Sequence, residues 1–196
     1  DLDLKSLIHI AIEGYSGTQL IPETASISSQ FIFDRMNGYF AEKGIKPSFS
    51  KAANASESLS PLDLLNRINA LQAFLRLAEA TDLIAANKRI FNILKKNNAL
   101  NLATKPKKKL LKIRAEIELS EYYERLRAKT DKLYQEKKYK QYLKEVAGFK
   151  ALIDDFFENV KVITEDREIT ENRLSIMSEV NRLFSRVGEL TYLDLS

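Results

Sequence analysis

Basic side chains are concentrated in one part of this 196-residue sequence, between Leu83 and Ala115. This window holds no Asp or Glu, and it contains ten basic residues: Lys88, Arg89, Lys95, Lys96, Lys105, Lys107, Lys108, Lys109, Lys112 and Arg114. The whole chain carries a formal +4 and the window +10, so the other residues sum to −6. Positive charge localised in this way attracts a polyanion, such as the phosphates of a nucleic acid.

The first basic residues of this window lie on one side of an expected helix. At about 100° per residue, residues 83–96 divide into a broad apolar arc and an opposite polar arc. One interpretation of the polar arc is the solvated face of an ordinary bundle helix. Such faces usually mix both signs of charge, so the lack of acidic neighbours favours a binding surface. The polar arc consists of Lys88, Arg89, Asn92, Lys95 and Lys96.

Four further basic residues complete the predicted binding set. Lys107 and Lys108 belong to the run KPKKK, in a loop expected over residues 97–109. Arg182 and Arg186 lie on the polar side of the last expected helix. Lysines attract phosphates with an affinity that falls with salt, and arginines can also stack on bases.

Two polar residues interrupt the apolar arcs of these helices. Asn87 falls in the middle of the first arc, where an unpaired amide costs on the order of 1–3 kcal/mol, so we expect it to form hydrogen bonds. Arg173 lies on the apolar side of the last helix, and we expect it to pair with a carboxylate. The candidate carboxylates are Asp154, Asp155 and Asp166.

The rest of the sequence predicts the helices that must position these surfaces. The chain is 44% hydrophobic and 30% charged with only 6 Gly and 4 Pro, which is typical of a helical domain. The fold class is therefore all-α, a helical bundle of about six to seven helices. Apolar periodicity and capping residues place them at residues 2–14, 26–43, 60–77, 79–97, 110–137, 140–159 and 170–187.

The weakest pattern in the chain lies at residues 45–58, which are small and polar. We interpret them as a domain boundary or an exposed linker. This stretch divides the chain into an N-terminal helical segment, residues 1–57, and a helical bundle, residues 58–196. Because the chain opens on Asp1 without an initiator Met, we expect it to be a piece of a longer protein.

Little in the sequence indicates catalysis. No P-loop and no metal-ligand spacing is present, so we predict no catalytic residue, no metal site and no cofactor for this chain. The single histidine, His9, is interpreted as a packing or surface residue. The lack of cysteine fits a cytoplasmic protein. No apolar run approaches the roughly 20 residues of a membrane span, so we expect no membrane partner.

Tyrosines on the later helices have two interpretations. They are either platforms on which unpaired bases stack or half-buried residues that pack between helices, and packing is the more common role. These residues are Tyr122, Tyr123, Tyr134, Tyr139 and Tyr142.

Several segments resemble one family of RNA-binding domains. ANKRIFNILKK, residues 86–96, is similar to the opening helix of the DALR-type anticodon-binding domain of arginyl-tRNA synthetases and related enzymes. Residues 142–166 and 171–196 resemble, in the same order, that family's later helix with an aromatic pair and its terminal helix. Residues 97–114 are longer and richer in lysine than the family pattern. Among such proteins, the likeness is greatest to the bacterial glycyl-tRNA synthetase beta-subunit family, over FDRMNGYFAEKGI, LNRINALQAFL, DDFFENVKV and NRLSIM.

The resemblance implies a function and partners. It implies the tRNA anticodon-binding region of a glycine–tRNA ligase, which holds the anticodon stem-loop of glycine tRNA. It also implies an alpha subunit that carries the aminoacylation centre, in an alpha2beta2 assembly, with ATP and magnesium used by the whole enzyme. Two alternatives stay open: a non-catalytic helical scaffold that docks an acidic protein, and a generic nucleic-acid-binding module.

Overall fold

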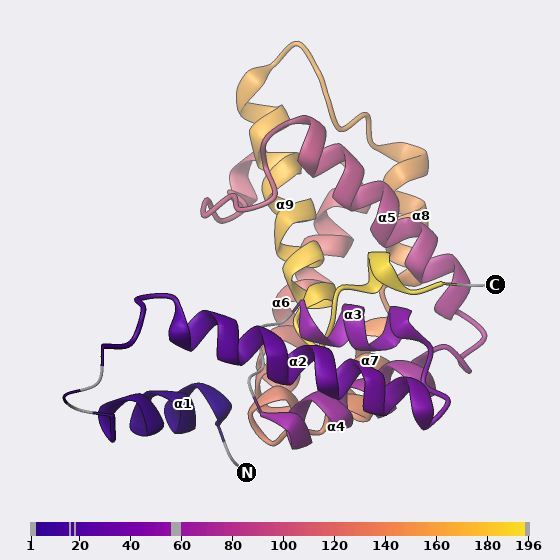
Figure 1. Ribbon diagram of the computed structural model, residues 1–196. Helices are drawn as coiled ribbons and strands as arrows, with labels where there is room; N and C mark the ends of the chain where they lie inside the picture. The colour runs from indigo at the N-terminus through magenta and orange to yellow at the C-terminus, as the bar shows by residue number, and fades with distance from the viewer. Residues whose placement is uncertain (1–2, 16, 18, 56–59, 195–196) are drawn as a thin grey trace.

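The computed structural model describes residues 3–15, 17, 19–55 and 60–194 of the chain (Figure 1). No β-strand occurs within these ranges, so the prediction of an all-α fold is confirmed. The helices are α1 (Leu4–Glu13), α2 (Thr24–Glu42), α3 (Pro47–Asn54), α4 (Pro61–Phe74), α5 (Ala80–Lys96), α6 (Arg114–Gln135), α7 (Tyr139–Ala147), α8 (Lys150–Asn159) and α9 (Arg167–Ser185), with 3-10 turns η1 (Lys108–Leu110) and η2 (Leu190–Tyr192).

Capping residues set several of the predicted helix ends. The Ser60 side chain accepts a hydrogen bond of 3.2 Å from the backbone N–H of Asp63, and Pro61 occupies the first position of α4. Asp166 caps α9 in the same way, accepting from the N–H of Ile169 at 3.1 Å. Gly44 follows the end of α2 with a φ of +76°, a conformation that glycine adopts without strain. These local signals explain why the helix positions could be predicted closely.

The prediction of an exposed linker at residues 45–58 is wrong over residues 47–54, which form α3. Phe49, Ala52 and Ala53 of α3 are buried, and α3 packs against α4 and η2. Small residues allow this close packing, although they left little apolar periodicity in the sequence. The predicted boundary between residues 57 and 58 lies outside the described residues, and the division into 1–57 and 58–196 stays a prediction.

The single helix predicted at residues 140–159 is instead two helices, α7 and α8, separated at Gly148. A Cβ atom at Gly148 would lie 2.2 Å from the hydroxyl of Tyr122 on α6, so the phenol packs directly against the turn where glycine leaves room for it. The next residue, Phe149, is fully buried and meets the ring of Phe184 edge-on at 5.8 Å. The apolar period continues across the turn, which is why periodicity alone predicts one helix.

A buried arginine joins the helices of the bundle. Arg67 of α4 is only 3% exposed, and its guanidinium donates hydrogen bonds to groups on α4, α6 and α7 and on the turn after α9. Such a network fixes where α9 ends relative to α4. The acceptors include Asp63 Oδ2 at 2.7 Å, the Arg186 carbonyl at 2.8 Å, the Val187 carbonyl at 3.1 Å, the Tyr134 hydroxyl at 2.9 Å and the Tyr139 hydroxyl at 3.2 Å.

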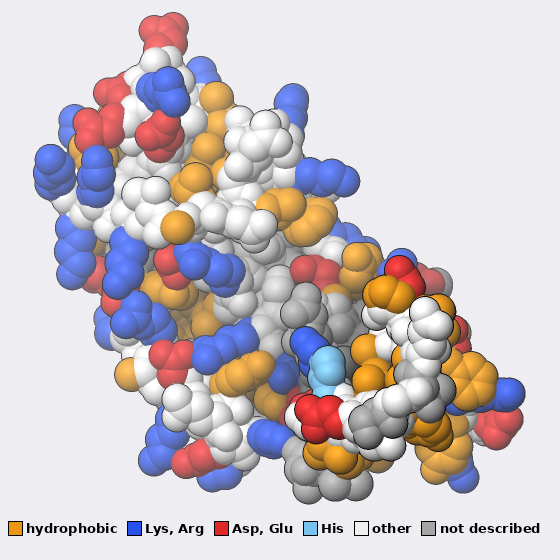
Figure 2. All heavy atoms as spheres, turned by 60° about the vertical axis from the view of Figure 1, so that its left-hand side comes forward, with side chains coloured by type: hydrophobic (Ala, Val, Ile, Leu, Met, Phe, Trp, Pro, Cys, Tyr) orange, Lys and Arg blue, Asp and Glu red, His pale blue; other side chains and the backbone are white. Residues whose placement is uncertain are grey.

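The first two helices pack against each other and keep an exposed apolar surface. Figure 2 shows hydrophobic side chains gathered on the lobe of the molecule that carries the histidine of α1. None of the helices within the described ranges is both long and apolar enough to cross a membrane. The exposed apolar side chains include Leu7, Ile10, Ile27, Phe31 and Tyr39.

Candidate nucleic-acid interface

Helix α5 divides into a buried face and a polar face, as predicted. Leu83, Ile84 and Leu94 are fully buried where α5 packs against α8, α9 and η2. On the other side, Arg89, Asn92, Lys95 and Lys96 are exposed and Lys88 is half-buried. The structure therefore brings the five predicted α5 residues together on one helix at the surface.

The predicted site residues differ in whether a carboxylate already neutralises them. Within the described residues, none of the four α5 cations forms a salt bridge. Three other candidates do form one: Lys107 with Glu168 at 3.0 Å, Arg182 with Glu179 at 2.6 Å, and Arg186 with Asp131. Cations without an internal partner keep their charge available for an external anion, so α5 is the stronger candidate surface.

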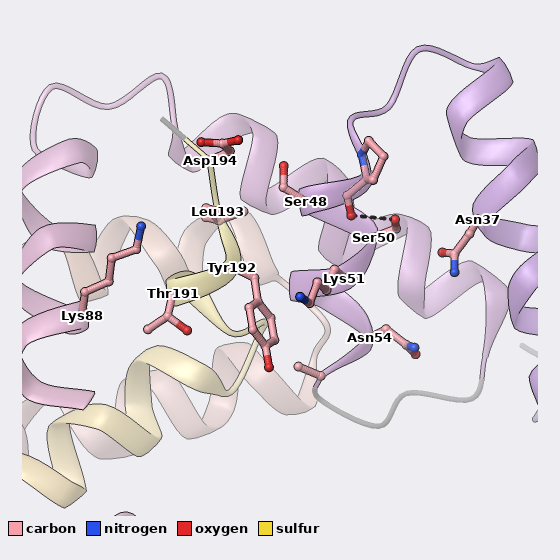
Figure 3. Close-up of a pocket in the computed structure, with 12 residues that line it drawn as sticks. Asn37, Ser48, Ser50, Lys51, Asn54, Lys88, Thr191, Tyr192, Leu193 and Asp194 are labelled. Atoms are coloured by element: carbon pink, nitrogen blue, oxygen red, sulfur yellow. Dashed lines mark hydrogen bonds between the residues drawn. The ribbon is translucent and has the colours of Figure 1, made fainter. Parts of the chain in front are cut away.

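Neighbouring residues of α5 face two different surface hollows. Lys88 lines a hollow formed with α2, α3 and the C-terminal turn η2 (Figure 3). Arg89 lines a second hollow with α8, where its guanidinium lies 3.9 Å from the centre of the Phe157 ring. Of the polar face, Lys88 therefore borders the first hollow and Arg89 the second.

The loop after α5 is attached to the start of α9. The backbone N–H of Lys107 donates to Asn172 Oδ1 at 2.6 Å, next to the Lys107–Glu168 ion pair. Lys108 begins η1 and is exposed. These contacts hold the lysine run close to α9.

Arg182 and Arg186 are associated with α6 and the loop. Arg182 donates to the carbonyl of Leu102 at 3.2 Å in addition to its ion pair. The Arg186 guanidinium lies 4.2 Å from the centre of the Tyr134 ring on α6. Both side chains therefore brace the bundle, a role that the sequence pattern did not reveal.

Two predictions about buried polar side chains need correction. Arg173 does pair with a carboxylate, but its partner is Glu116 of α6 and not one of the three predicted aspartates. Glu116 also accepts a hydrogen bond from the N–H of Ile113 at 3.1 Å. One carboxylate therefore both caps α6 and neutralises the charge of Arg173 on α9. Asn87 is fully buried, and neither its amide nitrogen nor its oxygen has a hydrogen-bond partner, contrary to the prediction.

For the tyrosines of the later helices, the packing interpretation is confirmed. Tyr139 and Tyr142 are buried, and the Tyr142 hydroxyl donates to the Leu183 carbonyl at 2.7 Å. Burial raises the pKa of both phenols above the usual value of 10.0. The sequence reasoning missed Tyr192 of η2, which is 43% exposed and lines the same hollow as Lys88. Its position after the last long helix gave no periodic signal.

The helical fold and the polar face of α5 correspond to a known class of domain. The sequence pattern described as the DALR anticodon binding domain matches residues 83–191, from the first turn of α5 to η2. This match covers more than half of the chain, which belongs to that family.

The chain is also similar to proteins named glycine–tRNA ligase beta subunit. It is 35% identical over 192 residues to one from Coxiella burnetii, 34% over 193 residues to one from Colwellia psychrerythraea, and 32% over 192 residues to one from Photorhabdus laumondii. Each comparison covers 98% of this chain and 28% of the relative, so the chain spans somewhat over a quarter of their length. The resemblance inferred from the sequence motifs is confirmed.

Proposed function

We propose that this chain binds the anticodon loop of a tRNA through the polar face of α5. The observation that carries the proposal is the set of α5 cations without internal carboxylate partners, on the helix that opens the matched anticodon-binding domain. Because those charges are not neutralised within the fold, they are available for phosphates.

The chemistry of this face suits a single-stranded loop. Lysines position the phosphates, while bases that are splayed out of the loop are read by stacking and by hydrogen bonds to their edges. Glycine codons begin with GG, so the matching anticodon letters are both C. Cytosine needs an acceptor for its exocyclic amine and a donor for its carbonyl, and the amide of Asn92 offers both.

We propose further that the chain belongs to a glycine–tRNA ligase beta subunit and supports aminoacylation of glycine tRNA in the cytoplasm. The names of the relatives support this assignment. In this proposal an alpha subunit supplies the aminoacylation centre within an alpha2beta2 assembly.

ATP and magnesium belong to the whole enzyme in this proposal, and the chain itself uses no cofactor. Within the ranges that the structure describes, no three His, Cys, Asp or Glu side chains gather as metal ligands.

A titration with RNA tests the proposal. Labelled glycine tRNA and versions with C-to-U changes at the two anticodon cytosines are titrated with the 196-residue chain, and binding is followed by gel shift. We expect binding that weakens with each change. Binding that ignores the anticodon would favour a generic nucleic-acid-binding module, and a lack of binding would favour a scaffold for an acidic protein.

A further inference from the structure

A polar surface hollow of about 810 Å³ lies beside α5, between α2, α3 and η2 (Figure 3). It brings together segments from the beginning, middle and end of the chain. Its volume is in the range of small-molecule binding sites. Lys88 connects it directly to the polar face of α5.

An aromatic side chain stands exposed in this polar hollow. Tyr192 remains 43% exposed, while its neighbours Leu190 and Leu193 are buried and anchor η2. The backbone N–H of Glu189 donates to the carbonyl of Ala52 at 2.9 Å, which ties this turn to α3. Tyr192 is therefore an exposed ring on a fixed piece of backbone, as a stacking platform requires.

Two lysines from different helices accompany the ring. The ammonium of Lys51 lies 4.4 Å from the centre of the Tyr192 ring and covers one of its faces. Figure 3 shows Lys88 reaching toward the hollow from α5, on the side away from α3. Neither lysine has a salt-bridge partner among the described residues, and Asp194 is the one carboxylate that lines the hollow within those ranges.

Amide side chains complete the lining. Asn37 of α2 and Asn54 of α3 lie on the side of the hollow opposite α5. An amide can donate and accept hydrogen bonds, which is the capacity needed to meet the edge of a nucleobase. A ring, two cations and two amides together match the needs of one unpaired nucleotide better than those of a folded protein surface or a duplex.

We propose that this hollow holds one unpaired nucleotide of the bound RNA loop. The base stacks on the face of Tyr192 that Lys51 leaves free, and Lys51 and Lys88 contact the adjoining phosphates. The proposal rests on the proposed anticodon-loop function and adds the residue on which a base stacks. It also assigns α3 and η2, in addition to α5, to the RNA-binding surface.

Binding of the anticodon stem-loop of glycine tRNA to Tyr192→Ala tests the stacking. Fluorescence anisotropy with the 196-residue chain should show a loss of affinity of about 5- to 150-fold, the range of one base–aromatic stack. Tyr192→Phe keeps the ring and should bind within about 2-fold of the wild type. The matched control is Tyr39→Ala, because Tyr39 is also exposed, with the Lys43 ammonium 5.5 Å from its ring, but lies outside the hollow.

A second readout detects the stack itself. A pyrrolo-cytosine placed in turn at each unpaired position of the loop should lose fluorescence at one position on binding the wild type and Tyr192→Phe, but not on binding Tyr192→Ala. Equal affinity and equal quenching for Tyr192→Ala and wild type would overturn this inference while leaving anticodon-loop binding intact. No binding of the loop by the wild type would overturn both the proposed function and this inference.

Discussion

The guanidinium of Arg89 lies 3.9 Å from the centre of the Phe157 ring, so a side chain of α8 holds one cation of α5 at the molecular surface. Lys95 and Lys96 at the end of the same helix have no comparable restraint among the described aromatic rings. A guanidinium that is already positioned loses less conformational entropy when it meets a base or a phosphate. This relationship makes Phe157 a positioning residue for the proposed interface.

Phe157→Ala should therefore weaken RNA binding without removing any charge. An exposed cation–π contact is worth about 0.5–1 kcal/mol, which corresponds to a loss of affinity of about 2- to 5-fold. The control is Phe31→Ala, which removes the ring beneath Arg35 at 5.4 Å, far from α5 in sequence. Anisotropy titrations at fixed salt measure both variants, and equal losses would contradict a special role for Phe157.

Charge reversal on α5 should have a much larger effect. Arg89→Glu combined with Lys96→Glu is expected to abolish binding of glycine tRNA and to leave the helical circular dichroism signal unchanged, because both side chains are exposed. Intact binding would refute the assignment of this face.

The same change of charge in the loop provides the control. Lys105→Glu with Lys109→Glu should weaken binding of cognate and C-to-U tRNAs to a similar degree, because loop lysines contribute salt-dependent attraction without reading bases. A loss confined to the cognate tRNA would show instead that the loop takes part in recognition.

The buried pair of Asp63 and Arg67 should dominate the stability of the bundle. Asp63→Asn removes the charge that faces Arg67 at 2.7 Å and should lower the free energy of unfolding by about 3–5 kcal/mol. Urea denaturation measures the change. Glu171→Gln, in the exposed pair with Arg167, is the control and should change stability by no more than about 1 kcal/mol. Similar values for the two variants would mean that the Arg67 network does not hold the helices together.

Gly188 lies where the turn after α9 meets α3 and α4. A Cβ there would be 2.9 Å from Leu71 Cδ1 and 3.0 Å from the Ala52 carbonyl oxygen. Gly188→Ala should therefore destabilise the fold by about 1–3 kcal/mol and displace η2. Gly38→Ala is the control, since a Cβ at Gly38 meets nothing within 4 Å and Ala favours a helix. Thermal melts distinguish the two, and equal melting temperatures would contradict the tight approach.

The buried tyrosines predict a loss of stability at alkaline pH. Burial, and for Tyr139 also the hydrogen bond to Asp63, raises the pKa of Tyr139 and Tyr142 above 10.0. At pH values between the pKa of these phenols in the unfolded state and their higher pKa in the native state, the unfolded state releases protons that the native state keeps. Their contribution to the free energy of unfolding is therefore complete below about pH 10 and falls above it. Urea midpoints at about pH 9 and about pH 11 should show this fall, and Tyr142→Phe should reduce its slope. A midpoint independent of pH would refute the raised pKa values.

Much of the architecture was predictable because its signals are local. Ser60 and Asp166 cap helices through hydrogen bonds that span three residues, and the polar face of α5 follows from the helical period alone. The family resemblance also rests on short segments of the sequence, such as residues 86–96. The sequence did not predict which residues far apart in the chain contact each other. Arg173 and Glu116, which form an ion pair, are 57 residues apart.

The sequence by itself therefore determined an all-α chain, the helix that presents the basic face, and the family to which the domain belongs. Only the tertiary structure decided that Arg186 is neutralised by Asp131, 55 residues away, and that Tyr192 stands beside Lys51. The physical reason is that hydrophobic periodicity records which side of a helix is buried, but not which helix covers it. Whether a charged side chain can bind an external anion depends on which helix packs beside it.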